Sequence, residues 1–84
     1  MGELTLYYSL SCPYCVRVLQ FMRAHGIETG MAPTTEPENA RHLTEVGGKN
    51  QVPCLFINGE ALYESNDIIA YLQKRFVDAP ATAL

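Results

Sequence analysis

The pattern of apolar and polar positions predicts a strand followed by a helix in the first third of the chain. The run Leu4–Tyr8 is short, apolar and aromatic, and small polar residues end it, which is typical of a strand. Apolar residues then recur at helical spacing over Val16–Met22. A proline suits the first position of a helix, and Gly26 suits a left-handed cap, so we predict a helix over Pro13–His25.

The middle of the chain predicts a weaker strand and a second helix. We expect the strand over Ile27–Met31, interrupted by Gly30. Thr35 and Glu38 have the spacing of a capping box, which marks a helix start. The residues that follow mark one helical face: Ala40, Leu43 and Val46.

The last third predicts a hairpin and a third helix. Val52–Ile57 and Glu60–Tyr63 are expected to pair as antiparallel strands, because Asn58-Gly59 between them is a strong signal for a tight turn. Ser65 is a good N-cap for the final helix. The inward face of that helix is expected to carry Ile68, Ile69, Leu72 and Phe76.

The resulting order, β-α-β-α-β-β-α, predicts an α/β fold. A right-handed βαβ unit followed by a hairpin gives one four-stranded mixed sheet with helices on both faces. We expect a single domain over residues 1–77 and a fraying tail over residues 78–84.

Composition narrows the possible partners and compartments. The chain has 84 residues, a net charge of −3 and scattered lysines and arginines, which argues against binding nucleic acid or a membrane surface. We expect no membrane span and no signal peptide. The odd count of three cysteines does not suit a secreted disulfide framework, so a cytoplasmic location fits best.

The sequence Cys12-Pro13-Tyr14-Cys15 carries the candidate chemistry. A helix N-terminus presents unpaired N–H groups and a partial positive charge, and both stabilise Cys12 as a thiolate. Cys15 lies one turn further into the helix, where it is expected to be more buried. We therefore predict that Cys12 is the attacking nucleophile and Cys15 the resolving thiol.

Other interpretations of the cysteines are weaker. A zinc site needs four ligands, and neither histidine has ligand-like spacing to a cysteine, so we expect no metal. A purely structural disulfide does not suit a reducing compartment. Cys54 is interpreted as a buried apolar residue, with a third redox thiol as the alternative.

Three motifs resemble those of the glutaredoxin family: C-P-Y-C after a first strand, V-P before a later strand, and E-S-x-D at a helix start. The resemblance covers nearly the whole chain except its tail, and it implies a thioredoxin fold. The segment Y-E-S-N-D-I-I is also similar to the N-terminal domain of glutathione transferases, which has the same fold.

The glutaredoxin resemblance implies glutathione as co-substrate. It implies that the Val52 backbone pairs with the cysteine of glutathione, that Pro53 is cis, and that the helix start at Ser65 receives the γ-glutamyl carboxylate. Asp67 is a candidate for holding the ligand's amine. The full set of implied glutathione-binding residues is Tyr14, Gln51, Val52, Pro53, Glu64, Ser65, Asn66 and Asp67. Plainer interpretations remain open, namely a trans proline at a strand start and an ordinary N-cap with an acidic first turn.

Two departures from the glutaredoxin pattern keep alternatives open. Ser9 stands where many members have a lysine, and Tyr63-Glu64 replaces the usual Gly-Gly. We predict a monomeric, glutathione-dependent thiol–disulfide oxidoreductase that acts on protein disulfides and glutathionylated proteins. The alternatives are a thioredoxin-like reductant served by a flavoprotein reductase and a [2Fe–2S] cluster-binding module. A full glutathione transferase is not expected, because that enzyme needs a large helical domain for its second substrate and this sequence ends soon after Phe76.

Overall fold

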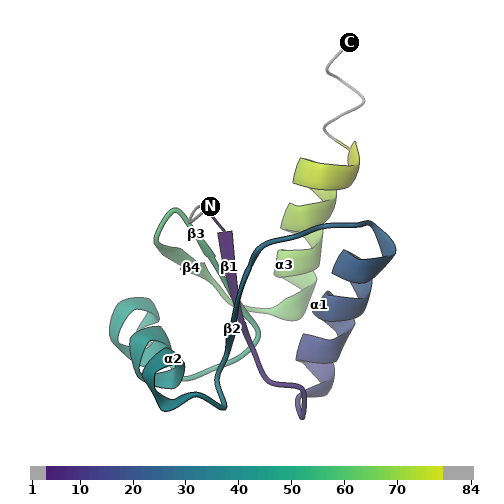
Figure 1. Ribbon diagram of the computed structural model, residues 1–84. Coiled ribbons are helices and arrows are strands. Elements are labelled where there is room, and N and C mark those ends of the chain that lie inside the picture. Colours follow the sequence, from purple (N-terminus) through teal and green to yellow (C-terminus); the bar gives the residue numbers. More distant parts are fainter. Residues whose placement is uncertain (1–3, 79–84) are drawn as a thin grey trace.

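The chain folds around one four-stranded sheet (Figure 1), and the computed structural model describes residues 4–78. The strands are β1 (Leu4–Tyr8), β2 (Gly30–Pro33), β3 (Cys54–Ile57) and β4 (Glu60–Leu62). The helices are α1 (Pro13–Ala24), α2 (Pro37–His42) and α3 (Ser65–Leu72). Single π-helical segments continue α2 over Leu43–Gly47 and α3 over Gln73–Asp78. The predicted element order of a thioredoxin fold is confirmed.

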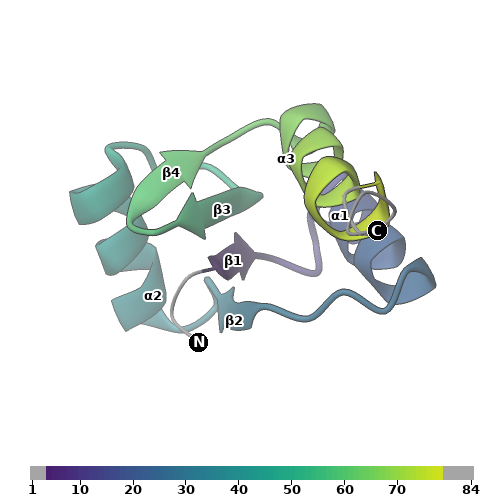
Figure 2. The ribbon, with the colours of Figure 1, turned by 90° about the horizontal axis from the view of Figure 1, so that it is seen from above.

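The strand order in the sheet is β2-β1-β3-β4. β1 pairs in parallel with β2 and antiparallel with β3, while β3 and β4 form the antiparallel hairpin. A parallel pair needs a crossover, which α1 supplies. Figure 2 shows α1 and α3 together on one face of the sheet and α2 on the other. The predicted mixed sheet with helices on both faces is therefore present.

The alternation of side chains along each strand divides the core into two layers. Leu6 of β1 and Leu55 of β3 point toward α1 and α3, where they join the larger cluster. Tyr7 and Phe56, which neighbour them in sequence, point to the α2 side and form the smaller one. The larger cluster contains Leu4, Leu6, Val18, Met22, Ile27, Leu55, Ile68 and Leu72. The smaller cluster contains Tyr7, Ala32, Leu43, Cys54 and Phe56.

The second strand lies three residues later than the sequence pattern predicted. β2 begins at Gly30, and Ile27 is instead a buried residue on the way from α1 to the sheet. Gly30 pairs with Thr5, and a Cβ on Gly30 would lie 3.1 Å from the Thr5 hydroxyl oxygen. The glycine that seemed to interrupt a strand is thus the first paired residue, because the two strands approach closely there.

The second helix also differs from its prediction. It begins at Pro37 with Glu36 as its N-cap residue, which makes no side-chain capping bond, so the capping box of Thr35 and Glu38 is wrong. Leu43 is fully buried, but Val46 is 51 % exposed. The chain winds as a π-helix from Leu43, which turns more slowly than an α-helix and moves Val46 off the buried face.

The remaining element boundaries shift by one or two residues. α1 ends at Ala24, and Gly26 has the predicted left-handed conformation with a φ of 65°. β3 begins at Cys54 rather than at Val52, and β4 ends one residue before Tyr63. The tail predicted over residues 78–84 lies outside the described residues, except for Asp78, which ends the last helical segment. No helix within residues 4–78 has the length and apolarity that crossing a membrane requires.

Candidate active site

Cys12 lies at the N-terminus of α1 and is its N-cap residue, with extended backbone angles. Its thiol is partly buried and points at the carbonyl oxygen of Val52, with 3.8 Å between sulfur and oxygen. Burial opposes ionisation, but hydrogen bonds from the Cys15 N–H, the Cys15 thiol and the Tyr14 N–H outweigh it. The pKa of Cys12 is therefore lowered, as predicted from its place at the helix start.

Cys15 is fully buried, one turn along the same helix. The pKa of its thiol is raised to about 11, mainly by burial and also by the nearby Cys12 sulfur. A hydrogen bond from the Ser9 N–H, at 3.4 Å, opposes this shift. Cys12 is thus the more acidic of the two thiols, and Cys15 keeps its proton at neutral pH.

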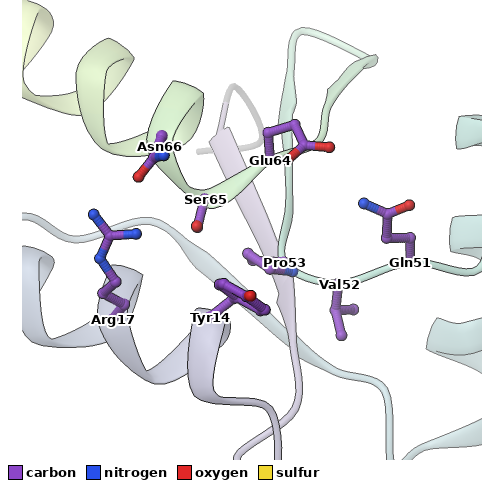
Figure 3. Close-up of a pocket in the computed structure, with 8 residues that line it drawn as sticks. All are labelled: Tyr14, Arg17, Gln51, Val52, Pro53, Glu64, Ser65 and Asn66. Atoms are coloured by element: carbon purple, nitrogen blue, oxygen red, sulfur yellow. The ribbon is translucent and has the colours of Figure 1, made fainter.

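A pocket of about 300 Å³ lies between the start of α1, the loop before β3 and the start of α3. Figure 3 shows its lining, which comprises Tyr14, Arg17, Gln51, Val52, Pro53, Glu64, Ser65 and Asn66. Seven of these eight residues belong to the set that the family resemblance implies for glutathione binding, and the eighth is Arg17. The Cys12 sulfur reaches the edge of the pocket at Val52.

The loop before β3 forms one wall of the pocket. Pro53 is buried, and the Val52–Pro53 peptide bond is cis, as the family resemblance implied. Gln51 is exposed beside it, and Val52 is half-buried. The Val52 carbonyl oxygen of this wall faces the Cys12 sulfur.

The start of α3 forms the opposite wall. The N-cap residue is Glu64, not Ser65 as predicted, and Glu64 has a positive φ of 71°. Ser65 is therefore the first helical residue; it is buried, and its hydroxyl points into the pocket (Figure 3). The first N–H groups of a helix have no partner within the helix, so this wall suits a negatively charged group.

Arg17 brings a positive charge to the pocket that the sequence analysis missed. It lies three residues after Tyr14 on α1, so both side chains share one face of the helix. In Figure 3 its guanidinium group points toward α3, on the side where Asn66 lies. Helical spacing from Tyr14 was the signal that could have identified it.

Two other predicted residues lie elsewhere. Asp67 is exposed on the first turn of α3 and does not line the pocket, so its contact with an amine stays a prediction. Cys54 is fully buried in the α2-side cluster, as its apolar interpretation predicted. Among residues 4–78, no group of three or more histidine, cysteine or acidic side chains is placed to hold a metal ion.

Comparison with known proteins identifies relatives of this arrangement. The chain is 35% identical to Glutathione S-transferase L1 of Arabidopsis thaliana over 83 residues, which is 95% of this chain and 35% of that protein. It is 29% identical to a probable glutathione transferase of Aplysia californica over 73 residues, covering 87% of this chain and 79% of that protein. The crystal structure of glutathione transferase Omega 3C from Trametes versicolor superposes with a TM-score of 0.76 at 26% identity, over 90% of this chain and 34% of that one.

The chain thus spans about a third of the length of the Arabidopsis and Trametes proteins. The matching family is the one indicated by the segment Y-E-S-N-D-I-I, rather than glutaredoxin specifically. Its profile, described as the N-terminal domain of glutathione S-transferase, matches residues 6–80. This chain belongs to the family of glutathione S-transferase N-terminal domains, with a thioredoxin-like fold.

Proposed function

We propose that this chain is a glutathione-dependent thiol–disulfide oxidoreductase that acts through the Cys12 thiolate. The observation that carries the proposal is the position of Cys12. Its sulfur, with a lowered pKa, lies 3.8 Å from the Val52 carbonyl at the edge of a pocket of tripeptide size. Membership of the glutathione transferase family supports glutathione as the ligand of that pocket.

Glutathione carries two carboxylates and one amine, and the pocket offers matching groups. The N–H groups at the start of α3, the Ser65 hydroxyl and the Arg17 guanidinium suit the γ-glutamyl carboxylate. Glu64 lines the same pocket and offers a carboxylate for the amine. The backbone of Val52 suits the cysteine of glutathione, which places the ligand's sulfur next to Cys12.

The proposed reaction begins with a protein–glutathione mixed disulfide. The Cys12 thiolate attacks the glutathione sulfur, so a Cys12–glutathione disulfide forms and the protein sulfur leaves as a thiolate that takes a proton from water. A second glutathione, as its thiolate, then attacks the glutathione sulfur held on Cys12. Glutathione disulfide leaves, and the Cys12 thiolate is restored.

Cys15 supports a second route for protein disulfides. Attack by Cys12 leaves a mixed disulfide with the substrate, and Cys12 then no longer carries a charge. One cause of the raised pKa of Cys15 is the Cys12 anion, so its loss favours ionisation of Cys15 beside the Ser9 N–H. The Cys15 thiolate attacks the Cys12 sulfur, releases the substrate thiol and forms a Cys12–Cys15 disulfide, which two glutathione molecules reduce.

Thiol–disulfide exchange fits this pocket better than conjugation of glutathione to an electrophile. Conjugation uses the glutathione sulfur as the nucleophile. Here a protein sulfur of lowered pKa stands at the pocket edge, where it can attack the glutathione sulfur of a bound mixed disulfide and displace the partner thiolate. We also propose a cytoplasmic location and disulfide-bearing or glutathionylated proteins as partners, because a reducing compartment keeps all three thiols free.

The test is turnover of a glutathionylated peptide by glutathione, coupled to glutathione reductase and NADPH. We expect turnover by the wild-type protein, complete loss in Cys12→Ser, and retained deglutathionylation in Cys15→Ser with loss of protein-disulfide reduction. Activity in Cys12→Ser would refute the proposed nucleophile. A folded wild-type protein that turned over only with a flavoprotein reductase, and not with glutathione, would refute the proposed co-substrate.

A further inference from the structure

Tyr63 lies outside the lining of the pocket, yet its side chain connects the two pocket walls. It follows β4 directly and precedes Glu64. Its hydroxyl donates a hydrogen bond to the backbone oxygen of Lys49 at 3.1 Å and accepts one from the Lys49 N–H at 3.3 Å. Both backbone groups of one loop residue are thus bonded to one side-chain atom.

The surroundings of the hydroxyl leave it little freedom. A Cβ on Gly47 would lie 2.5 Å from the Tyr63 hydroxyl oxygen, so the end of the second helical segment passes this close to Tyr63 because residue 47 is glycine. The Lys49 ammonium lies 5.0 Å from the centre of the Tyr63 ring, on its face. The Tyr63 side chain is therefore packed closely against Gly47 and Lys49.

Cys54 adds a further contact to the same hydroxyl. Burial is the main cause that raises the pKa of the Cys54 thiol to about 11, and a hydrogen bond with the Tyr63 hydroxyl opposes that shift. Burial likewise raises the pKa of Tyr63. Both groups thus keep their protons at neutral pH, so the hydroxyl remains a donor to Lys49.

These contacts join two segments of the chain that lead into opposite walls of the pocket. Lys49 is two residues before Gln51 in the first wall, and Tyr63 is next to Glu64 in the second. We propose that Tyr63 is a positioning residue, whose hydroxyl clamps the loop at Lys49 and so holds the Gln51–Pro53 wall at the distance that glutathione requires. The affinity part of this inference rests on the proposed function, whereas the clamp itself does not.

The first experiment compares Tyr63→Phe with the wild-type protein in glutathione-dependent turnover. Removing the hydroxyl should raise KM for glutathione about fivefold, while kcat stays within about twofold, because the clamp acts on binding and touches no reacting atom. Tyr71→Phe is the matched control, since the Tyr71 hydroxyl also accepts a hydrogen bond, from Arg75 at 2.7 Å, but lies outside the pocket lining. An unchanged KM in Tyr63→Phe, or an equal rise in both variants, would overturn the clamp.

A double-mutant cycle tests the close contact with Gly47. Gly47→Ala alone should raise KM for glutathione as Tyr63→Phe does, because the added methyl group displaces the hydroxyl. In the Tyr63→Phe background that methyl group meets no hydroxyl, so Gly47→Ala should add little. Fully additive effects of the two substitutions would contradict a shared clamp.

Amide hydrogen exchange separates the clamp from the proposed function. In Tyr63→Phe, exchange over residues 47–52 should be faster than in the wild type, while exchange in α1 stays the same. If the wild-type protein shows no turnover with glutathione, the proposed function and the affinity part fail together. The positioning role is then judged by exchange alone, where unchanged rates over residues 47–52 overturn it and faster rates sustain it.

Discussion

Cys12 and Cys15 differ in acidity although only one helical turn separates them. Cys12 receives hydrogen bonds from N–H groups of the first turn, whereas Cys15 is buried where those groups are already engaged. The buried Cys15 thiol also donates a hydrogen bond to the Cys12 sulfur. This bond favours the thiolate form of Cys12 and the protonated form of Cys15. Pro13 contributes by starting the helix directly after Cys12.

Arg17 is the residue whose contribution to ligand binding can be tested most directly. Arg17→Gln removes the positive charge and keeps a polar side chain on α1. We expect KM for glutathione to rise about threefold to tenfold with kcat unchanged, because the lost charge acts on a bound carboxylate. Turnover kinetics at low and high salt provide the measurement, and the KM of Arg17→Gln should rise less with salt than that of the wild type.

Arg23→Gln is the matched control for Arg17. It removes the same charge from the exposed side of the same helix, outside the pocket lining. Its KM for glutathione should equal that of the wild type. If the two variants behave alike, Arg17 contributes only to the overall field of the protein and not to the pocket.

At the scale of elements, the start of α3 differs from what its sequence suggests, because the expected N-cap residue is not the one that caps the helix. Serine is a common N-cap residue, but Glu64 occupies the N-cap position, with a left-handed φ, and Ser65 follows it. Ser65→Ala should therefore cost less than the ~1 kcal/mol typical of a lost cap in urea unfolding. It should still raise KM for glutathione, because the Ser65 hydroxyl points into the pocket.

Thr44→Ala is the control for that substitution, since its hydroxyl donates to the Ala40 carbonyl on the exposed side of the second helix. It should leave KM unchanged. If Ser65→Ala lost as much stability as the loss of a capping residue costs and left KM unchanged, Ser65 would act as a helix cap and would have no role in ligand binding.

Local patterns predicted most elements because the determinants are local. The short apolar and aromatic run predicted β1 to the residue, and Asn58 and Gly59 both have the positive φ values that their turn requires. Errors arose where tertiary contacts decide. Gly30 pairs with Thr5 from a distant strand, and the slower winding after His42 exposes Val46. The pairing of Gly30 with Thr5 joins distant residues, so no sequence window contains it.

The site was predictable to the extent that motifs mark it. The motifs C-P-Y-C, V-P and E-S lie in the three segments that line the pocket, and the fold brings these segments together. Arg17 was missed because an exposed arginine on a helix has no motif of its own. Tyr63 was read only as a departure from a glycine pair, although its hydroxyl reaches Lys49, 14 residues earlier in the chain.

At the scale of the whole molecule, the three thiols predict a stability that passes through a maximum with pH. The lowered pKa of Cys12 contributes stability that is present above the unfolded value of about 8.5 and is lost as pH falls through the folded pKa. Cys15 and Cys54 have the opposite sign. Their pKa values are raised to about 11, so their contribution is complete below about pH 8.5 and is lost as pH rises toward 11.

Urea unfolding between pH 6 and pH 10, with a phosphine reductant present, measures this profile. The free energy of unfolding should peak near pH 8 and then fall by up to about 1.4 kcal/mol per pH unit for each buried thiol. Stopping at pH 10 limits the contribution of Tyr7 and Tyr63, whose pKa values burial raises and which act with the same sign at higher pH.

Two variants test which thiol causes the rise in stability below pH 8 and which causes the fall above it. Cys12→Ser should remove the rise below pH 8, and Cys54→Ala should reduce the fall above it by about half, because one of two buried thiols is gone. Cys54→Ala also lowers stability at every pH, since it empties space in the α2-side cluster, but this offset does not change the slope. A fall of the same slope in Cys54→Ala would mean that Cys54 ionises as freely in the folded chain as in the unfolded one, which its complete burial beside Tyr63 does not permit.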